Sequence, residues 1–395
     1  MENPKIRFKG FTKDWEQRKL GDIYGSIGNA FVGTATPYYA EHGHFYLESN
    51  NVKDGQINHN AEIFINDEFY EKQKDKWLHT GDMVMVQSGH VGHAAVIPEE
   101  LDNTAAHALI MFRNPKEEIE PYFLNYEYQT DKAKKQIENI TTGNTIKHIL
   151  ASDMQEFVVD IPKYEEQKVI ASYFCNLDNL ITLHQRKCEQ TKKLKKYMLQ
   201  KMFPRNGAKV PEIRFDGFTY DWEQRKFSEL YARSSEKNDG SIGMDKNITV
   251  ATMQFKNDVK VSTTEYLKTY YTFKLGDIAF EGHQSKEFRY GRFVENDIGN
   301  GIVSHIFAVF RPIQEYDLYF WKYAINNETL MQRILARSTK ASTMMHDLVT
   351  NDFLNETFLV PSVKEQKQIG AFLNKLDNII TLHQRQHKLH LNMLL

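Results

Sequence analysis

The sequence predicts an α+β protein in which two similar α/β domains are joined by two long helices packed as an antiparallel coiled coil. Two observations predict this fold: two sequence blocks each occur twice, and one block carries apolar residues at helical spacing. A chain of 395 residues also exceeds one ordinary hydrophobic core, which favours at least two domains.

The internal repeat is the strongest feature. Residues 4–24, PKIRFKGFTKDWEQRKLGDIY, return 207 residues later at 211–231 with 14 of 21 positions identical. Residues 161–187 return 199 residues later at 360–386 with 14 of 27 identical, including ITLHQR. The inserts between these blocks, about 25–160 and 232–359, hardly resemble each other. Repeated blocks on either side of inserts that differ predict a pseudo-twofold molecule with two divergent surfaces.

The second repeated block predicts a long helix. Ile161–Phe203 reads as one helix of roughly 35–40 residues, with Pro162 at its start, where proline is tolerated. Its seam steps by four and three residues through Ile170, Phe174, Leu177, Ile181, His184, Cys188 and Thr191. The copy from Val360 repeats this register through Ile369, Leu373, Leu376, Ile380, His383, His387 and His390. Two such seams predict an intramolecular coiled coil, and ~38 residues at ~1.5 Å each would span ~57 Å.

These boundaries predict domains at 1–160 and 208–359 and spacer helices at 161–207 and 360–395. Each insert carries a turn followed by a buried strand, then an apolar strand closed by an arginine. The strand pairs are Leu78–Gln87 with Leu275–Phe280, and His107–Arg113 with His305–Arg311. Amphipathic helical stretches follow at Glu120–Asn139 and Asp317–Ala336, and then polar segments at 141–148 and 338–346. The inserts therefore share one fold.

Composition limits the classes of function. Hydrophobic content of 41% is that of a folded protein, and no apolar run is long enough to span a bilayer. Cys175 and Cys188 would lie ~20 Å apart on one helix and cannot pair. We therefore expect a cytoplasmic, reduced protein without a membrane partner. The net charge of −2 counts mildly against nucleic-acid binding, although a small basic face can be diluted by acidic surface elsewhere.

Motifs for covalent chemistry are absent from the sequence, so no catalytic residue is predicted. There is no phosphate-binding GxxxxGK[ST] loop, and Asp258-x-Lys260 lacks the upstream Pro-Asp pair of a nuclease. Glu166 and Glu365 begin helices, where a carboxylate favours the positive dipole end. The seam histidines, with His184 and Cys188, could suggest a metal. A polar layer that fixes helix register is the preferred interpretation, and no metal is predicted.

Polar and basic side chains recur at equivalent places in the two inserts. Glutamine and asparagine suit adenine edges, arginine and lysine suit guanine, and lysines contact phosphates. A lysine cluster on the first long helix continues to Lys201, Arg205 and Lys209, with a solvated helix face as the alternative. The candidate DNA-binding residues are Gln87, Ser88, His90, Asn144, Thr145, Lys147, Lys192, Lys193, Lys196, Gln284, Ser285, Lys286, Arg289, Arg292, Lys340, Ser342 and Thr343.

The order of these motifs resembles the specificity subunit of type I restriction-modification enzymes. The resemblance rests on Trp15–Ile23, Gly81-Asp82, Gly143–His148, Ile161-Pro162, Glu166-Gln-Lys168 and Leu177-Asp178, with the arrangement repeated once. In the second insert, Ser338–Met344 lacks the glycine of the first, which weakens the carry-over of that loop.

The resemblance implies two target-recognition domains, each reading one half of a bipartite, asymmetric DNA site, with the helices setting the gap. It implies that two modification subunits dock on the constant regions and use S-adenosylmethionine to methylate adenine. It also implies that restriction subunits join for cleavage that depends on ATP and Mg. Those activities and cofactors would belong to the partners, so none is expected in this chain.

Two other classes of function stay open on the residues alone. The first is a non-enzymatic protein-interaction scaffold with two adaptor modules on a coiled coil. The second is a stand-alone DNA enzyme, which the missing motifs disfavour. Binding of a long duplex with a steep salt dependence would separate the DNA reader from the scaffold.

Overall fold

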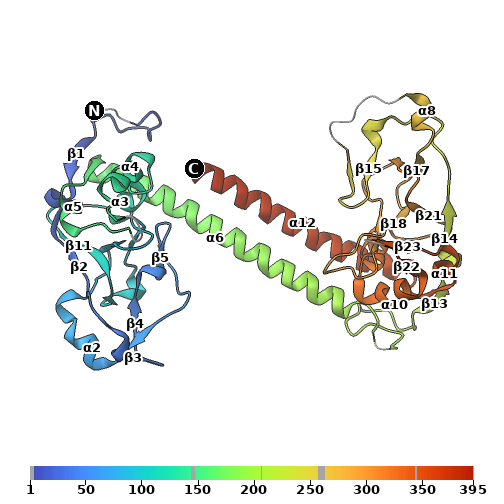
Figure 1. The fold of residues 1–395 in the computed structure, drawn as a ribbon, viewed down its shortest axis with the longest axis horizontal. Helices are drawn as coiled ribbons and strands as arrows, with labels where there is room; N and C mark the ends of the chain where they lie inside the picture. Colours follow the sequence, from blue (N-terminus) through green and yellow to red (C-terminus); the bar gives the residue numbers. More distant parts are fainter. Residues whose placement is uncertain (1–3, 144–146, 206, 257–262, 343–344, 395) are drawn as a thin grey trace. The chain divides into compact units, whose positions relative to one another are not determined.

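The computed structural model describes residues 4–143, 147–205, 207–256, 263–342 and 345–394. The chain divides into two compact units: unit 1 is Met1–Ile181 with His390–Leu395, and unit 2 is Thr182–Leu389. Each unit holds a domain of mixed helix and sheet, and the long helix α6 (Tyr164–Lys201) continues from unit 1 into unit 2 (Figure 1).

Both units are built on the same four-stranded antiparallel sheet. Its strand order is β2-β11-β8-β9 in unit 1 and β14-β21-β18-β19 in unit 2. The strands are β2 (Tyr24–Asn29), β8 (Met83–Val86), β9 (Ala94–Val96), β11 (Leu109–Pro115), β14 (Tyr231–Ser234), β18 (Ile278–Glu281), β19 (Arg292–Glu295) and β21 (Ala308–Pro312). This identity of strand order confirms that the two divergent inserts share one fold.

A second strand pair ties the two repeated blocks together in each unit. In unit 1, β1 (Glu16–Lys19) pairs antiparallel with β12 (Val158–Ile161), and Gln17 lies opposite Asp160. In unit 2, β13 (Glu223–Lys226) pairs in the same way with β24 (Thr357–Val360), and Gln224 lies opposite Leu359. The short helices after β1 and β13 are α1 (Leu20–Ile23) and α7 (Phe227–Leu230).

The units differ in their additional strands and short helices. Unit 1 has a sheet of order β10-β4-β7-β3, from β3 (Tyr39–Ala40), β4 (His44–Leu47), β7 (Phe64–Ile65) and β10 (Ala105–Ala106), and the pair β5 (Val52–Lys53) with β6 (Gln56–Ile57). Unit 2 has the pairs β15 (Ile248–Thr249) with β16 (Gln254–Phe255), β17 (Tyr271–Phe273) with β20 (Gly301–Val303), and β22 (Thr339–Ala341) with β23 (His346–Leu348). The short helices are α2 (Asp67–Lys72), α5 (Ala151–Gln155), α8 (Thr264–Leu267) and α11 (Thr350–Asn355).

The helical stretch predicted in each insert is broken into two helices. In unit 1 these are α3 (Pro121–Glu127) and α4 (Asp131–Ile140), and in unit 2 they are α9 (Leu318–Ile325) and α10 (Glu328–Ser338). Thr130 accepts a hydrogen bond from the backbone N–H of Ala133 at 3.2 Å, and Asn327 accepts one from Thr329 at 3.1 Å. Each break therefore falls where a side chain caps a new helix.

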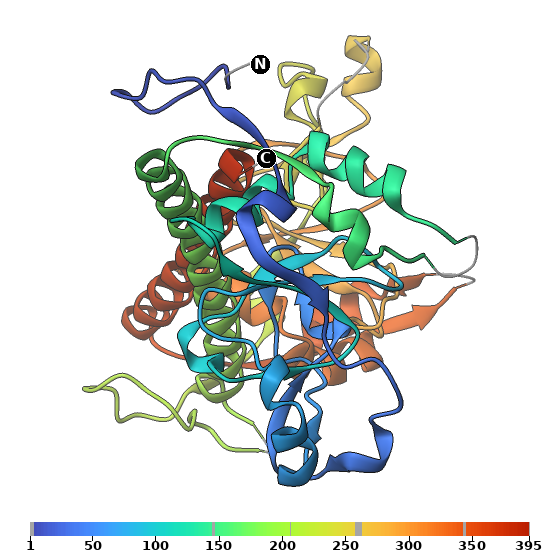
Figure 2. The ribbon, with the colours of Figure 1, turned by 90° about the vertical axis from the view of Figure 1, so that its left-hand side faces the viewer.

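The long helices pack antiparallel, as predicted. Within unit 2, residues 182–201 of α6 lie beside residues 363–389 of α12 (Val363–Leu394) (Figures 1 and 2). His184 Nδ1 and His383 Nδ1 are 3.0 Å apart, and one nitrogen donates to the other. These histidines hold the same position in the repeat, so the helices meet at their own counterparts, as an antiparallel pair requires. No helix in the described ranges is long and apolar enough to cross a membrane.

A buried arginine–glutamate pair joins each domain to the start of its long helix. Arg7 donates from Nε and Nη2 to Glu166, both at 2.6 Å, and Arg214 donates to Glu365 at 2.7 and 2.8 Å. Glu166 and Glu365 are 2% and 1% exposed, respectively. The prediction that they only favour the helix start was therefore incomplete.

A tyrosine–aspartate bond also repeats, but its surroundings differ. Tyr126 donates to Asp178 at 2.6 Å in unit 1, and Tyr323 donates to Asp377 at 2.6 Å in unit 2. In unit 2, Lys195 also donates to both oxygens of Asp377, at 2.6 and 2.8 Å. The described part of unit 1 gives Asp178 no such cation, and burial raises the pKa of its carboxyl group.

We predict that the two aspartates contribute unequally to stability. Asp377→Asn keeps an acceptor for Tyr323 but leaves the partly buried Lys195 ammonium without its carboxylate, and should cost about 1–2 kcal/mol. Asp178→Asn is the matched control and should change stability by less than about 0.5 kcal/mol, because the half-buried carboxylate has no cation to lose among the described residues. Urea unfolding of the full chain measures both, and equal losses would contradict the asymmetry.

Candidate nucleic-acid interface

In unit 1, two polar loops far apart in sequence are held against each other. The loop that follows β8 donates from Gly89 N to Lys147 O at 3.0 Å, and Ile149 N donates to Gln87 O at 2.9 Å. Ser88 and His148 form an isolated antiparallel bridge between the same segments. The two polar segments predicted in the first insert therefore form one surface at the end of β8.

Unit 2 brings the equivalent segments together through a hairpin. The second polar segment forms β22 and β23, and His346 N donates to Gly282 O at 2.8 Å, next to the end of β18. His283 and Met345 form an isolated bridge. A Cβ at Gly282 would lie 2.1 Å from His346 O, so this close approach requires glycine.

Several predicted side chains point to solvent at these two surfaces. In unit 1, His90 and Lys147 are exposed, whereas Gln87 and Ser88 are half-buried. In unit 2 the exposed ones are Gln284, Ser285, Lys286, Arg289, Lys340 and Ser342. Asn144, Thr145 and Thr343 lie outside the described residues.

Two of the predicted residues already serve their own domain. Arg292 donates from Nε to Glu281 at 2.8 Å and from Nη2 to Ala251 O at 2.7 Å. Ser285 accepts hydrogen bonds from the backbone N–H groups of Glu287 and Phe288 at 3.2 and 3.0 Å. Arg292 thus anchors the β18–β19 region, and Ser285 shapes its loop.

The α6 lysines lie beside the second loop surface. Lys192, Lys193 and Lys196 are exposed and form no ion pair in the part of the chain that is described. A cavity of about 720 Å³ within unit 2 is lined by Lys192 and Lys196 together with Glu287 and Phe288 of the loop after β18. The sequence did not indicate that these two regions meet.

Unit 1 carries a cavity of about 430 Å³ next to its own loop surface. It is lined by residues that include His93, Lys134 and Lys147. Burial lowers the pKa of His93, and its Nδ1 accepts a hydrogen bond from the backbone N–H of Asp54 at 3.3 Å. A Cβ at Gly92, where φ is +86°, would meet Ile137 at 2.7 Å, so glycine lets this loop pack closely on α4.

The geometry defines a class of protein: two copies of one sheet domain, each presenting a different polar loop pair and each tied to a long antiparallel helix. Residues 12–193 and 220–392 both match the family model described as type I restriction modification DNA specificity domain. The chain belongs to this family, which confirms the resemblance drawn from the sequence.

Two curated relatives come from Methanocaldococcus jannaschii. The type I restriction enzyme MjaVIII specificity subunit is 24% identical over 192 residues, which is 47% of this chain and 45% of that protein. The putative type I restriction enzyme MjaX specificity subunit is 28% identical over 205 residues, or 50% of this chain and 48% of that protein. The chain thus spans about half the length of the curated relatives it matches.

The fold is similar to a solved structure over its whole length. The crystal structure of the type I restriction-modification system S subunit from M. genitalium aligns with a TM-score of 0.61. The alignment covers 100% of this chain and 97% of that chain at 15% sequence identity. At this identity the likeness shows the fold alone.

We predict that the α6 lysines contribute a salt-sensitive part of DNA affinity. In the assembled complex, replacing Lys192, Lys193 and Lys196 with alanine should weaken duplex binding about tenfold or more and reduce the salt slope by about 2 to 3. The matched control replaces the exposed α12 lysines Lys364, Lys375 and Lys388, which removes the same charge. Filter binding at several salt concentrations measures both, and equal losses in the two variants would argue against a localised phosphate contact.

Proposed function

We propose that this chain is the non-catalytic DNA-recognition subunit of a type I restriction-modification complex, and that each unit reads one half of a bipartite, asymmetric site. The proposal rests on one observation: the central sheet is the same in both units, whereas the loops beside it differ. Both units repeat the strand order of the central sheet, while the paired loops differ in side chain and in structure. Equal scaffolds with unequal loops fit two unequal half-sites.

The base contacts would come from the exposed loop residues of each unit. His90 and Lys147 would act in unit 1, and Gln284, Lys286 and Arg289 in unit 2. Arginine and lysine suit guanine, and glutamine suits adenine, so the two loop pairs would prefer different bases. Joining both readers in one chain makes the second contact intramolecular, which raises overall affinity for the full site.

The long helices would dock the modification subunits. Apolar side chains follow an outer stripe of α6 and are between 37% and 49% exposed: Val169, Tyr173, Leu180, Leu183, Leu194 and Tyr197. On α12, Leu382 and Leu389 are each 53% exposed. Their spacing is that of a heptad stripe, which suits packing by a partner helix.

Chemistry in this proposal belongs to the partners. Two modification subunits would bring S-adenosylmethionine and transfer its methyl group to adenine, and restriction subunits would bring ATP and Mg for cleavage. The complex would act on double-stranded DNA in the cytoplasm. The role of this chain would be to fix which sequence, and which spacing, the partners meet.

We predict that exchange of one module changes one half-site only. Replacing residues 25–160 with the equivalent insert of another specificity subunit should give a new first half-site with an unchanged second half-site and gap. Methylome sequencing of cells that carry the chimaera with its modification subunit measures this. A change in the second half-site would contradict independent reading by the two modules.

We predict that longer helices widen the gap. Duplicating Gln185–Thr191 in α6 and Gln384–His390 in α12 adds one heptad to each helix and keeps the seam in phase. Each helix gains about 10.5 Å, and the gap should grow by about three base pairs. Duplication in α6 alone is the control, because it mismatches the helices and should abolish assembly. An unchanged gap in the double variant would show that the helices do not set the spacing.

A further inference from the structure

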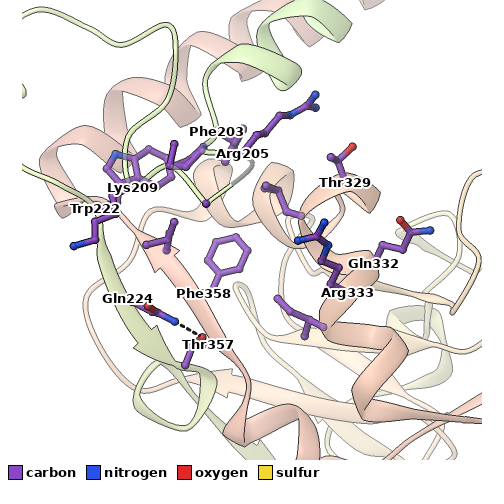
Figure 3. A pocket seen from close by; sticks show the side chains of 16 residues that line it. Phe203, Arg205, Lys209, Trp222, Gln224, Thr329, Gln332, Arg333, Thr357 and Phe358 are labelled. Atoms are coloured by element: carbon purple, nitrogen blue, oxygen red, sulfur yellow. Dashed lines mark hydrogen bonds between the residues drawn. The ribbon is translucent and has the colours of Figure 1, made fainter.

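Unit 2 contains a second cavity, of about 580 Å³, which adjoins the one beside the α6 lysines and shares Arg205 and Thr329 with it. It lies between the segment that follows α6, the strands β13 and β24, and the helix α10 (Figure 3). Its floor includes the buried rings of Phe203 and Phe358. It is therefore a hollow with an apolar base rather than a flat polar surface.

The charged side chains around this cavity are all cationic. Arg205, Lys209 and Arg333 line it, and none of the described lining residues is an aspartate or glutamate. Lys209 lies 3.6 Å from Asp221, but both side chains are more than 60% exposed, so this pair is weak. Figure 3 shows Arg333 and Gln332 on α10, across the cavity from Phe203 and Lys209.

Two of these cations have no acceptor of their own. Arg205 Nε is buried and has no hydrogen-bond partner among the described residues. Arg333 is exposed and forms no ion pair within the same ranges. An enclosed guanidinium N–H without an acceptor is costly, so a ligand that supplies a carboxylate oxygen would gain a charge-assisted hydrogen bond.

The matching surface of unit 1 supplies its own acceptor. There, Lys132 of α4 bonds to Asp160 of β12, and Gln136 donates to Val158 O at 2.9 Å. The strand register places Leu359 of unit 2 where unit 1 has Asp160, because each lies opposite the equivalent glutamine of the first repeated block. Unit 2 has Leu359 in place of that carboxylate and Thr329 in place of Lys132, and its cations at this surface come from other positions.

We propose that this cavity binds an acidic peptide segment of the modification subunit, with an apolar side chain over Phe358 and carboxylates at Arg205 and Arg333. The inference rests on the proposed assembly with that subunit. A duplex backbone is a convex ridge that needs only surface cations, whereas a hollow with an apolar floor fits a side chain. Because unit 2 has Leu359 where unit 1 has Asp160, the cavity would distinguish the two copies of the partner.

Changes of charge at two exposed positions, 332 and 333, test the proposal without disturbing the core. Gln332 is exposed on α10 and lines the cavity. Gln332→Glu and Arg333→Glu should each weaken binding of the purified modification subunit to the full chain about tenfold. Gln332→Lys should not weaken it, and neither should Lys237→Glu, a charge change at an exposed lysine outside the cavity. Thermal unfolding should be unchanged in all four variants.

Two further readouts identify what occupies the cavity. A photo-crosslinking amino acid at position 332 of the assembled complex should couple to a stretch of the modification subunit that is rich in aspartate and glutamate. Coupling to a segment without acidic residues would overturn the proposal. So would a Gln332→Glu variant that loses duplex affinity and salt slope but assembles normally, because the cavity would then serve DNA. If the wild-type chain does not assemble with the subunit at all, the proposed function fails and this inference fails with it.

Discussion

The bidentate contact between a buried glutamate and an arginine of the first repeated block is the constraint on which the structure depends. Glu166 and Glu365 are enclosed at the start of the long helices, and a buried carboxylate is tolerated only when a cation and hydrogen bonds satisfy it. Arg7 and Arg214 supply both. The contact joins two elements that are far apart in sequence: the chain that enters each domain and the long helix that follows it. The same contact occurs in both units, although their polar loops differ.

The arginine–glutamate contact is the same in both units, but the ion pairing of the long helices differs. Lys195 places an ammonium on Asp377, and the described part of unit 1 has no cation at Asp178. The lysine belongs to the basic end of α6, which lies along unit 2. One side of the pseudo-twofold is therefore held by charge as well as by packing.

The sequence predicted the parts of the fold that depend on local pattern or on repetition. The antiparallel packing of the long helices and the meeting of His184 with His383 follow from heptad spacing and from the repeat. The heptad pattern did not indicate that Ile369 packs in the core of unit 2 and Ile170 against the core of unit 1. It did not predict the partner of Glu166, because Arg7 is 159 residues away and no local pattern marks a long-range ion pair. Similarly, the helix break at Thr130 depends on a side-chain cap that competes with a continuous helical pattern.

For the candidate interface, residue type indicated which segments matter but not how each side chain is used. The two loops of each unit meet because β8 and β18 end at equivalent points of the same sheet, which the repeat implied only through matching order. Arg292 shows why residue type alone is not enough to identify a base contact. Its charge suits guanine, but its Nε donates to Glu281 at 2.8 Å within the domain. Lys286, which lies six residues before Arg292 in the chain, is exposed. For the proposed reading of DNA, the available cations are those that the domain leaves unpaired, and that depends on tertiary contacts rather than on composition.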